Sequence, residues 1–298
     1  QADPHLLPKE SFLLLAISGG QDSMSMLQLL IDLKRIYKWE VSIWHGDHGW
    51  HENSHIFAKE LGTWCENKGL KFFYDKTNRR AIRNEADARE WRYTCLTERA
   101  KKNYQNISRE KNKGIFVLTG HTGSDRTETL LFNLSRGTDL SGLGSLTECR
   151  VLKDEIKLIR PLLCFTRKET EEICKELDLP IWIDPSNRNT TLSRNKIRHE
   201  IIPILEGLHP GCSLRISELS ERISNAKKEK EILVNLAIES IKLSNGICLK
   251  KLNSIPFQAR TTLLAYWIKS KGAPSLSSKS LSELSSIIQS KNQPGQKD

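Results

Sequence analysis

Short apolar runs alternate with amphipathic stretches along the N-terminal part of the chain. Consecutive apolar residues bounded by turn-forming residues are typical of buried strands, and apolar positions three and four residues apart are typical of helices. The pattern predicts strands at residues 12–18, 41–45, 71–74 and 115–119, with helices between them at 27–36, 55–68 and 87–101. Strands that alternate with helices predict a doubly wound, mostly parallel α/β sheet that binds ligands at the carboxyl ends of its strands.

The pattern changes further along the chain and becomes helical after Pro203. A β-rich stretch comes first, and the elements that we predict from there on are β structure at 150–163, a helix at 167–177, a strand at 181–184 and helices at 214–243, 256–270 and 277–289. We therefore expect a catalytic α/β domain over residues 1–206 and a smaller helical domain over residues 207–298.

The first predicted strand ends abruptly in the loop SGGQDS, residues 18–23. Gly-Gly and Asp are common in turns, and Asp22 or Ser23 could cap the helix that follows. A strand, a glycine turn and a helix N-terminus also aim backbone N–H groups and a helix dipole at one point, which suits phosphate. The loop has neither the Gly-Lys-Ser/Thr of a Walker A motif nor the third glycine of the dinucleotide fingerprint. It resembles instead the PP-loop of ATP pyrophosphatases, which cleave ATP between the α and β phosphates to form adenylates.

Two other stretches of the predicted sheet domain carry candidate chemistry. In EADAREWRY, Glu85, Arg89 and Arg92 lie on one helical face, as a surface ion pair or as two guanidiniums that grip phosphate. In LTGHTGSDRTET, His121 leaves a strand and Asp125 follows one helical turn later. A carboxylate there could hold Mg²⁺, bind an amine nucleophile or serve in helix capping.

A third stretch, WIDPSNRNTTLSRNKIRHEIIPIL, comes directly before the predicted domain boundary. It combines Asn187, Arg194 and Arg198 with serine and asparagine in what we expect to be a loop. Such residues suit contacts with the phosphates and sugars of RNA, although a solvated linker has a similar composition.

Charge adds a candidate partner to this picture. The net charge is +10, and residues 207–298 hold 14 Lys+Arg and 7 Asp+Glu, so +7 of it lies there. An excess of this kind fits a module that binds a polyanion, or a helical domain with solvated lysines. The seven cysteines are scattered without a Cys-x-x-Cys pair, which favours reduced thiols over disulfides, zinc or an iron–sulfur cluster. No long apolar run predicts a membrane span, and a chain that begins with Gln is expected to be trimmed at its start.

The order and spacing of these motifs resemble those of bacterial tRNA(Ile)-lysidine synthetases. The resemblance is close over residues 12–206, through the loop and GDHGWHENS, EADAREWRY, LTGHTGSDRTET, SRGTDLSGL, RPLL and DPSN…RNKIRHEIIPIL. It continues more loosely in IPFQARTTLLAYWI, and the family's C-terminal extension is shortened or cut off. Ser124 replaces the first of two paired aspartates, and Trp50-His51 stands in place of Leu-Arg after Asp-His-Gly.

This resemblance implies an ATP-dependent ligase that joins free lysine to C2 of the wobble cytidine in the CAU anticodon of tRNA(Ile). It implies ATP as a substrate, Mg²⁺ held by Asp22, and a location in the bacterial cytosol or the plastid stroma. The ATP-binding residues that it implies are Ser18, Gly19, Gly20, Gln21, Asp22, Ser23 and His48. The implied catalytic residues are Asp22, His121, Asp125, Arg89 and Arg194, and the implied tRNA-binding residues are Arg92, Asn187 and Arg198. Another PP-loop enzyme, such as a tRNA thiolase, and an inactive RNA-binding module remain as alternatives.

Overall fold

The computed structural model describes residues 6–49, 54–77, 82, 84–107, 114–182, 193–274 and 276–290. The chain divides into two compact units, Gln1–Ile223 and Ser224–Asp298. This division falls inside the long helix α9 (Cys212–Ile241), later than the boundary expected after residue 206. The division of function between residues 1–206 and 207–298 stays a prediction.

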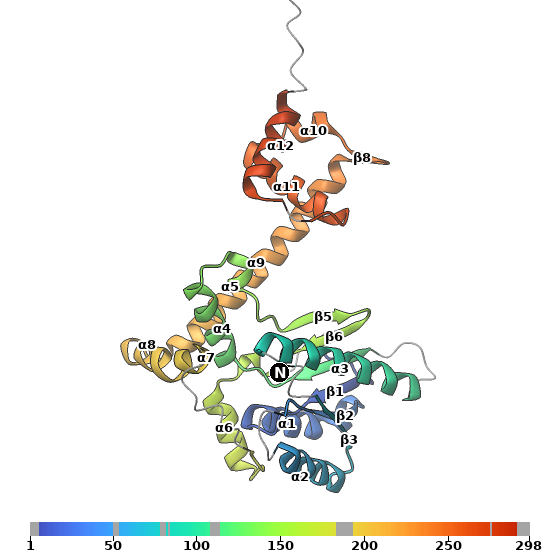
Figure 1. The fold of residues 1–298 in the computed structure, drawn as a ribbon, viewed down its shortest axis with the longest axis vertical. Coiled ribbons are helices and arrows are strands. Elements are labelled where there is room, and N and C mark those ends of the chain that lie inside the picture. The colour runs from blue at the N-terminus through green and yellow to red at the C-terminus, as the bar shows by residue number, and fades with distance from the viewer. Residues whose placement is uncertain are drawn as a thin grey trace, which may run out of the picture. The chain divides into compact units, whose positions relative to one another are not determined.

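A six-stranded sheet forms the centre of the first unit (Figure 1). Its strands stand in the order β3–β2–β1–β4–β6–β5, and only the edge strand β5 runs antiparallel to its neighbour. Their bounds are β1 Phe12–Ala16, β2 Glu40–Asp47, β3 Lys71–Lys76, β4 Ile115–Thr119, β5 Cys149–Lys153 and β6 Ile156–Ile159. The predicted doubly wound, mostly parallel α/β fold is therefore confirmed.

Helices cover both faces of this sheet. Alternate residues of β1 point to opposite faces: Leu13 packs in a core with Met24 and Leu27 of α1, and Leu14 in a core with Leu96 of α3. These five side chains are all buried, and burial on both faces explains why β1 is apolar throughout. The helices of the first unit, besides α9, are α1 Gln21–Tyr37, α2 Ser54–Asn67, α3 Glu85–Ile107, α4 Gly123–Ser135, α5 Leu140–Leu143, η2 Pro161–Cys164, α6 Arg167–Glu176, α7 Ser193–Lys196, η4 Ile197–Ile201 and α8 Ile202–Leu208.

The strand order reverses between β1 and β4. The chain passes from β1 to β2 on one side and later returns to β4 on the other side of β1. The chain therefore leads away from β1 and from β4 to opposite sides of the sheet, and the carboxyl edge between these strands is where doubly wound folds leave room for a ligand.

The structure corrects two local predictions. Residues 181 and 182 are not in a strand, and the rest of the predicted strand 181–184 lies outside the described residues. The stretch 193–208, the first part of which we expected to be a loop, is helical and includes a single π-helical segment, η4. Ile197 is buried there, so its packing outweighs the local preference of Ser and Asn for turns.

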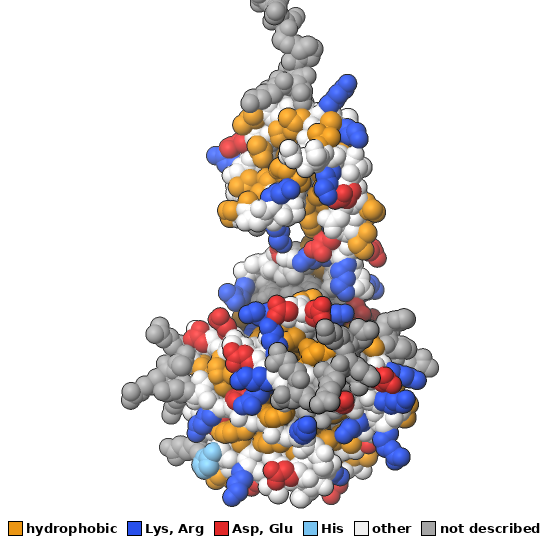
Figure 2. All heavy atoms as spheres, turned by 90° about the vertical axis from the view of Figure 1, so that its right-hand side faces the viewer, with side chains coloured by type: hydrophobic (Ala, Val, Ile, Leu, Met, Phe, Trp, Pro, Cys, Tyr) orange, Lys and Arg blue, Asp and Glu red, His pale blue; other side chains and the backbone are white. Residues whose placement is uncertain are grey.

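The second unit has a small core of its own. The end of α9 and the helices α10 (Leu249–Asn253), α11 (Phe257–Ser270) and α12 (Ser278–Ser290) surround buried leucines and isoleucines, beside the two short strands β7 (Lys242–Leu243) and β8 (Gly246–Ile247). Residues 224–298 hold 12 Lys+Arg and 5 Asp+Glu, a net charge of +7. Lys and Arg side chains are scattered over the face seen in Figure 2 among acidic and apolar ones. None of the helices in the described part of the chain has the length and apolar character needed to cross a bilayer.

Polar contacts join the first turns of α9 to α4 of the first unit, and they predict where a fragment can end. Thr127 donates a hydrogen bond to the Ser213 carbonyl at 2.6 Å, and the buried Arg126 pairs with Glu221 at 2.9 Å. A fragment of residues 1–206 loses both contacts and leaves Arg126 without its carboxylate. We expect it to be about 3 kcal/mol less stable than a fragment of residues 1–223 in urea unfolding followed by circular dichroism. Glu221→Gln in the longer fragment isolates the ion pair, and equal stability of the two fragments would contradict the prediction.

Candidate functional site

A cavity of about 450 Å³ opens at the carboxyl edge of the sheet. Side chains and backbone from the loops after β1, β2 and β4 line it, together with residues of α3, α6 and η4. Its lining includes Ser18, Gly20, Gln21, Asp22, Ser23, His45, Asp47, His48, Arg92, Gly120, His121, Asp125, Arg167, Trp182 and Arg198.

Hydrogen bonds of the Ser23 side chain hold the loop after β1 in its conformation. Ser23 Oγ accepts hydrogen bonds from the N–H groups of Ser18 and Gly19, each at 3.2 Å, and donates to the Gly20 carbonyl at 2.9 Å. Gly19 has φ +87°, and a Cβ there would lie 3.1 Å from the Trp182 ring, so glycine is required. Gly20 is the N-cap of α1 and offers no side-chain acceptor to its first turn. The backbone N–H groups in the first turn of α1 therefore have no side-chain acceptor from the cap and are suited to bind an anion.

Helix α6 anchors the start of α1. Gln21 donates from Nε2 to the Arg167 carbonyl at 2.8 Å, so its side chain is directed to α6. Thr170 Oγ1 donates to Asp22 Oδ1, and the Arg167 guanidinium donates to Asp22 Oδ2 at 3.2 Å. Burial raises the pKa of Asp22, and the charge of Asp125 adds to the increase, while Arg167 opposes it. A nearby cation therefore stabilises the ionised form of the Asp22 carboxylate.

The loop after β4 brings His121 and Asp125 to the same cavity. Thr122 is the N-cap of α4, and its N–H and hydroxyl donate to Asp125 Oδ2 at 2.8 and 3.1 Å in a capping box. His121 Nδ1 lies 2.8 Å from the Thr119 hydroxyl. Burial lowers the pKa of His121 well below 6.5, with Asp125 opposing and Arg160 and Arg92 adding to the decrease, so its imidazole is neutral at pH 7.

Arg198 lies in the cavity beside these acidic groups. Its guanidinium binds Glu128 in a bidentate pair at 2.6 and 2.8 Å and lies 3.5 Å from Asp125 Oδ1. Glu128 is buried and does not line the cavity, so it holds the guanidinium in place from behind. The tRNA-binding role of Arg198 stays a prediction. In the structure its side chain lies among the candidate catalytic residues of the cavity.

The end of β2 forms another wall of the cavity. His48 Nε2 lies 3.3 Å from the Arg92 guanidinium, and burial together with Arg92 lowers the pKa of His48 to about 4. Asp47 accepts from the Gly49 N–H and the Tyr74 hydroxyl, both at 2.7 Å, and so fixes the turn that carries His48.

Four predicted site residues, Gly19, Arg89, Arg194 and Asn187, are not among those that line this cavity, although Gly19 lies in the loop that borders it. Arg89 is exposed and lies over the Tyr93 ring, and Arg194 lies over the Phe132 ring at 5.9 Å. Asn187 lies outside the described residues, as do Trp50 and His51.

Arg167 and Thr170 were not predicted from the sequence as partners of Asp22. They are separated from it by 145 and 148 positions in the chain, so no local pattern relates them. The one available signal was the capping box of Thr166 and Glu169, which places Arg167 at the start of α6. Ser124, in place of the family's aspartate, accepts the Arg167 N–H at 3.1 Å and so joins α4 to α6.

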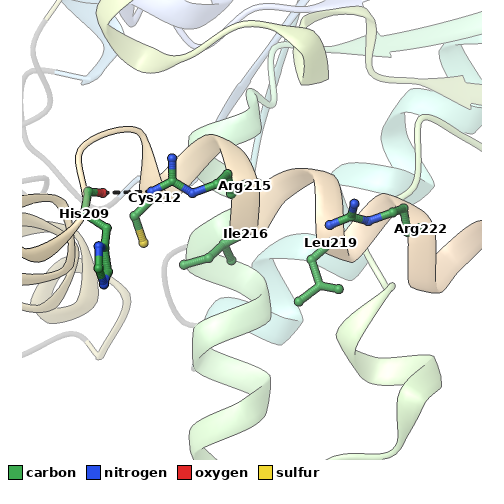
Figure 3. A pocket seen from close by; sticks show the side chains of 6 residues that line it. All are labelled: His209, Cys212, Arg215, Ile216, Leu219 and Arg222. Atoms are coloured by element: carbon green, nitrogen blue, oxygen red, sulfur yellow. Dashed lines mark hydrogen bonds between the residues drawn. The ribbon is translucent and has the colours of Figure 1, made fainter.

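A second hollow, of about 530 Å³, lies along the first turns of α9 (Figure 3). His209, Cys212, Arg215, Ile216, Leu219 and Arg222 line it. Arg215 donates to the carbonyls of Pro210 and His209. No carboxylate is among these lining residues, so the acid–base groups described above belong to the cavity at the sheet edge.

The donor set of that cavity fits Mg²⁺ bound together with phosphate. Mg²⁺ uses one or two carboxylates and completes its shell with water and phosphate oxygens. Asp22 and Asp125 both line the cavity, and their negative charges repel each other. A cation bound beside them would stabilise both carboxylates. Among the described residues there is no group of three metal-binding side chains, which a dedicated protein cage would require.

Comparisons with known proteins agree with this geometry. Residues 3–205 match the model of the PP-loop domain family. The tRNA(Ile)-lysidine synthase of Prochlorococcus marinus strain SARG is 49% identical over 297 residues, 99% of this chain and 87% of the relative. That of Parasynechococcus marenigrum WH8102 is 43% identical over 94% of this chain and 82% of the relative, and a chloroplastic one from Pyropia yezoensis is 37% identical over 74% and 64%. The U34-tRNA thiolase NcsA of Methanococcus maripaludis shares the fold, with a TM-score of 0.61 at 19% identity over 75% of each chain.

The sheet order, the SGGxDS loop at the switch point and the family match define a PP-loop nucleotide-binding enzyme. Within that class, the identity over nearly the whole chain is decisive. The chain belongs to the tRNA(Ile)-lysidine synthase family.

Proposed function

We propose that the enzyme joins free L-lysine to C2 of the wobble cytidine in the CAU anticodon of tRNA(Ile), with ATP converted to AMP and pyrophosphate. The observation that carries this proposal is one cavity with an anion-binding loop and Asp22 on one wall and Asp125 with a neutral His121 on another. The two walls suit the two half-reactions, adenylation of a base and attack by an amine.

In the first half-reaction the cytosine C2 oxygen attacks the α-phosphorus of ATP, and the bond to the β-phosphate oxygen breaks. The N-terminal turn of α1 would hold the phosphates, and Mg²⁺ on Asp22 would supply charge neutralisation for the leaving pyrophosphate. Arg167 is 3.2 Å from Asp22 and lines the cavity, so it is placed to pair with phosphate once a metal ion binds Asp22. Arg92 and Arg198, which line the cavity, are better placed for the adenylate than Arg89 and Arg194.

In the second half-reaction the lysine ε-amine attacks C2, and the C2–O bond breaks to release AMP. The ammonium must first lose a proton, because its reference pKa is near 10.4. Asp125 Oδ1 would bind the ammonium, since Oδ2 is already occupied by the Thr122 donors. His121 lies beside Asp125 and is neutral, but its lowered pKa makes it a weak base, so it is suited to accept a hydrogen bond from the ammonium, and Asp125 is the candidate for accepting the proton.

Membership of this family also supports the identity of the substrate tRNA and the cellular compartment of the enzyme. The net charge of +7 on residues 224–298 supports contact with the tRNA backbone. The relatives include bacterial enzymes and a chloroplastic one, which supports a bacterial cytosol or a plastid stroma.

The thiolase alternative lacks support in the cysteines. All seven lie among the described residues as free thiols, and no three metal-binding side chains converge in that part of the chain. An iron–sulfur cluster needs several cysteine ligands at one site. Release of AMP that requires both lysine and tRNA(Ile), with labelled lysine incorporated into the tRNA, would establish the ligase, and tRNA(Ile) that gains no lysine would refute it.

Asp22→Asn tests the assignment of Asp22 to the metal and the pyrophosphate. The change keeps the shape and removes the charge, so we expect pyrophosphate release to fall at least 100-fold while tRNA affinity stays within twofold. Asp32→Asn, an exposed position of the same helix, is the matched control and should be unaffected. Normal turnover by Asp22→Asn would show that the assignment is wrong.

Asp125→Asn separates the two half-reactions. We expect lysine attack to slow more than adenylation in single-turnover assays, because the carboxylate charge is what an ammonium requires. Glu169→Gln removes a carboxylate from the capping box of α6, away from the cavity, and should change neither step. Equal loss in both steps would assign Asp125 to the metal instead.

A fragment of residues 1–223 tests the division of labour. It ends where the first compact unit ends, so it should bind ATP normally and lose most of its tRNA affinity. The full chain should lose tRNA affinity steeply with rising salt, and the fragment less steeply. Filter binding over a salt series measures both, and unchanged affinity of the folded fragment would place the RNA site entirely on the α/β unit.

A further inference from the structure

Three arginines gather around one tyrosine at the β6 side of the sheet. The Arg150 guanidinium carbon lies 4.6 Å from the centroid of the Tyr93 ring, and that of Arg89 lies 5.5 Å from it. Burial alone would raise the pKa of Tyr93, but Arg89, Arg160 and Arg150 together lower it. The positive charges of all three guanidiniums therefore lie close to the Tyr93 side chain.

This cluster is short of acceptors. Arg160 is 1% exposed, and its guanidinium donates to the Thr147 carbonyl at 2.6 Å and to the Tyr93 hydroxyl. The Nε atoms of Arg160 and Arg150 are buried and have no hydrogen-bond partner among the described residues. In the same part of the chain none of Arg89, Arg150 and Arg160 forms an ion pair with a carboxylate. Buried cationic donors without acceptors are costly unless a ligand supplies the negative charge.

The register of the sheet places the cluster next to the catalytic cavity. Ile159, the last residue of β6, pairs with Leu118 of β4. Arg160 comes directly after β6 and is therefore level with Thr119, the last residue of β4, which precedes His121 by two positions. Burial lowers the pKa of His121, and Arg160, Arg92 and Arg89 contribute to the decrease, so their charges reach it. Tyr93 follows Arg92, which lines the cavity.

We propose that Arg89 and Arg150, with the buried Arg160 adding its charge from beneath, form an anion site that holds a backbone phosphate of the RNA beside the nucleotide whose base enters the cavity. The inference rests on the proposed function. A nucleotide in an anticodon loop carries a phosphate on each side of its sugar, and guanidiniums bind phosphate through paired N–H donors. The site fixes the backbone while the base turns toward His121, and it requires no recognition of sequence.

Arg150→Ala is the direct test, because Arg150 lies on an edge strand and outside the cavity. In the full chain we expect affinity for an RNA stem-loop with a CAU anticodon to fall about tenfold by fluorescence anisotropy. The slope of log affinity against log salt should become shallower by about 0.7, as for one contact with a single-stranded phosphate. Lys153→Ala removes one charge from the same strand at an exposed position and should leave both within twofold.

A neutral methylphosphonate identifies the phosphate. Placed on one side or the other of the wobble cytidine, it should weaken wild-type binding about tenfold at one position and weaken Arg150→Ala no further there. ATP affinity of Arg150→Ala should be unchanged, and a loss equal to that for RNA would assign the cluster to the nucleotide and overturn the proposal. Equal effects of Arg150→Ala and Lys153→Ala would also overturn it. If wild type binds neither the stem-loop nor whole tRNA(Ile), the proposed function itself fails, which is a distinct result.

Discussion

The backbone of Gly120 lies against the first turn of α1, and the geometry of the cavity depends on this contact. A Cβ at Gly120 would lie 2.9 Å from the Ser23 Cα and 3.0 Å from the Ser23 nitrogen. No side chain fits there, so the loop after β4 and the phosphate loop after β1 approach each other as bare backbone. The parallel pairing of β1 with β4 brings both loops to the same edge, and the missing side chain lets Asp22 and Asp125 share one cavity.

Paired charges then keep this crowded site stable. Asp22 is compensated by Arg167, and Asp125 and Glu128 by Arg198. Phosphate can compete for these arginines, and a metal ion or an ammonium can compete for the carboxylates. When substrates replace the internal partners, no buried charge is left unpaired. The contacts of α6 matter for the same reason, because its Thr170 and Arg167 hold Asp22 in position before any substrate arrives.

The sequence predicted the sheet and its ligand edge because these depend on local periodicity and on connection rules. It also predicted the loop, since SGGxDS combines a turn glycine, a helix start and a carboxylate within six positions. It could not predict that Arg198 lies with Glu128, that Arg167 binds Asp22 or that Arg160, directly after β6, lies level with the end of β4. Each of these pairs is distant in the chain and meets only through tertiary packing. The helical form of 193–208 was missed because burial of Ile197 outweighed the turn preference of its polar neighbours.

Asp125 shows why a capping role and a catalytic role need not compete. The Thr122–Asp125 box and the Thr166–Glu169 box have the same hydrogen-bond pattern, and each satisfies donors at the start of its helix. In Asp125 the cap uses Oδ2 and leaves Oδ1 toward Arg198 and the cavity, whereas Glu169 is exposed at the surface. Capping fixes the rotamer of the carboxylate, and a fixed carboxylate is what a site requires in order to bind an ammonium without reorganisation. Helix α4 begins at the switch point of the sheet, and that position turns an ordinary cap into a candidate catalytic group.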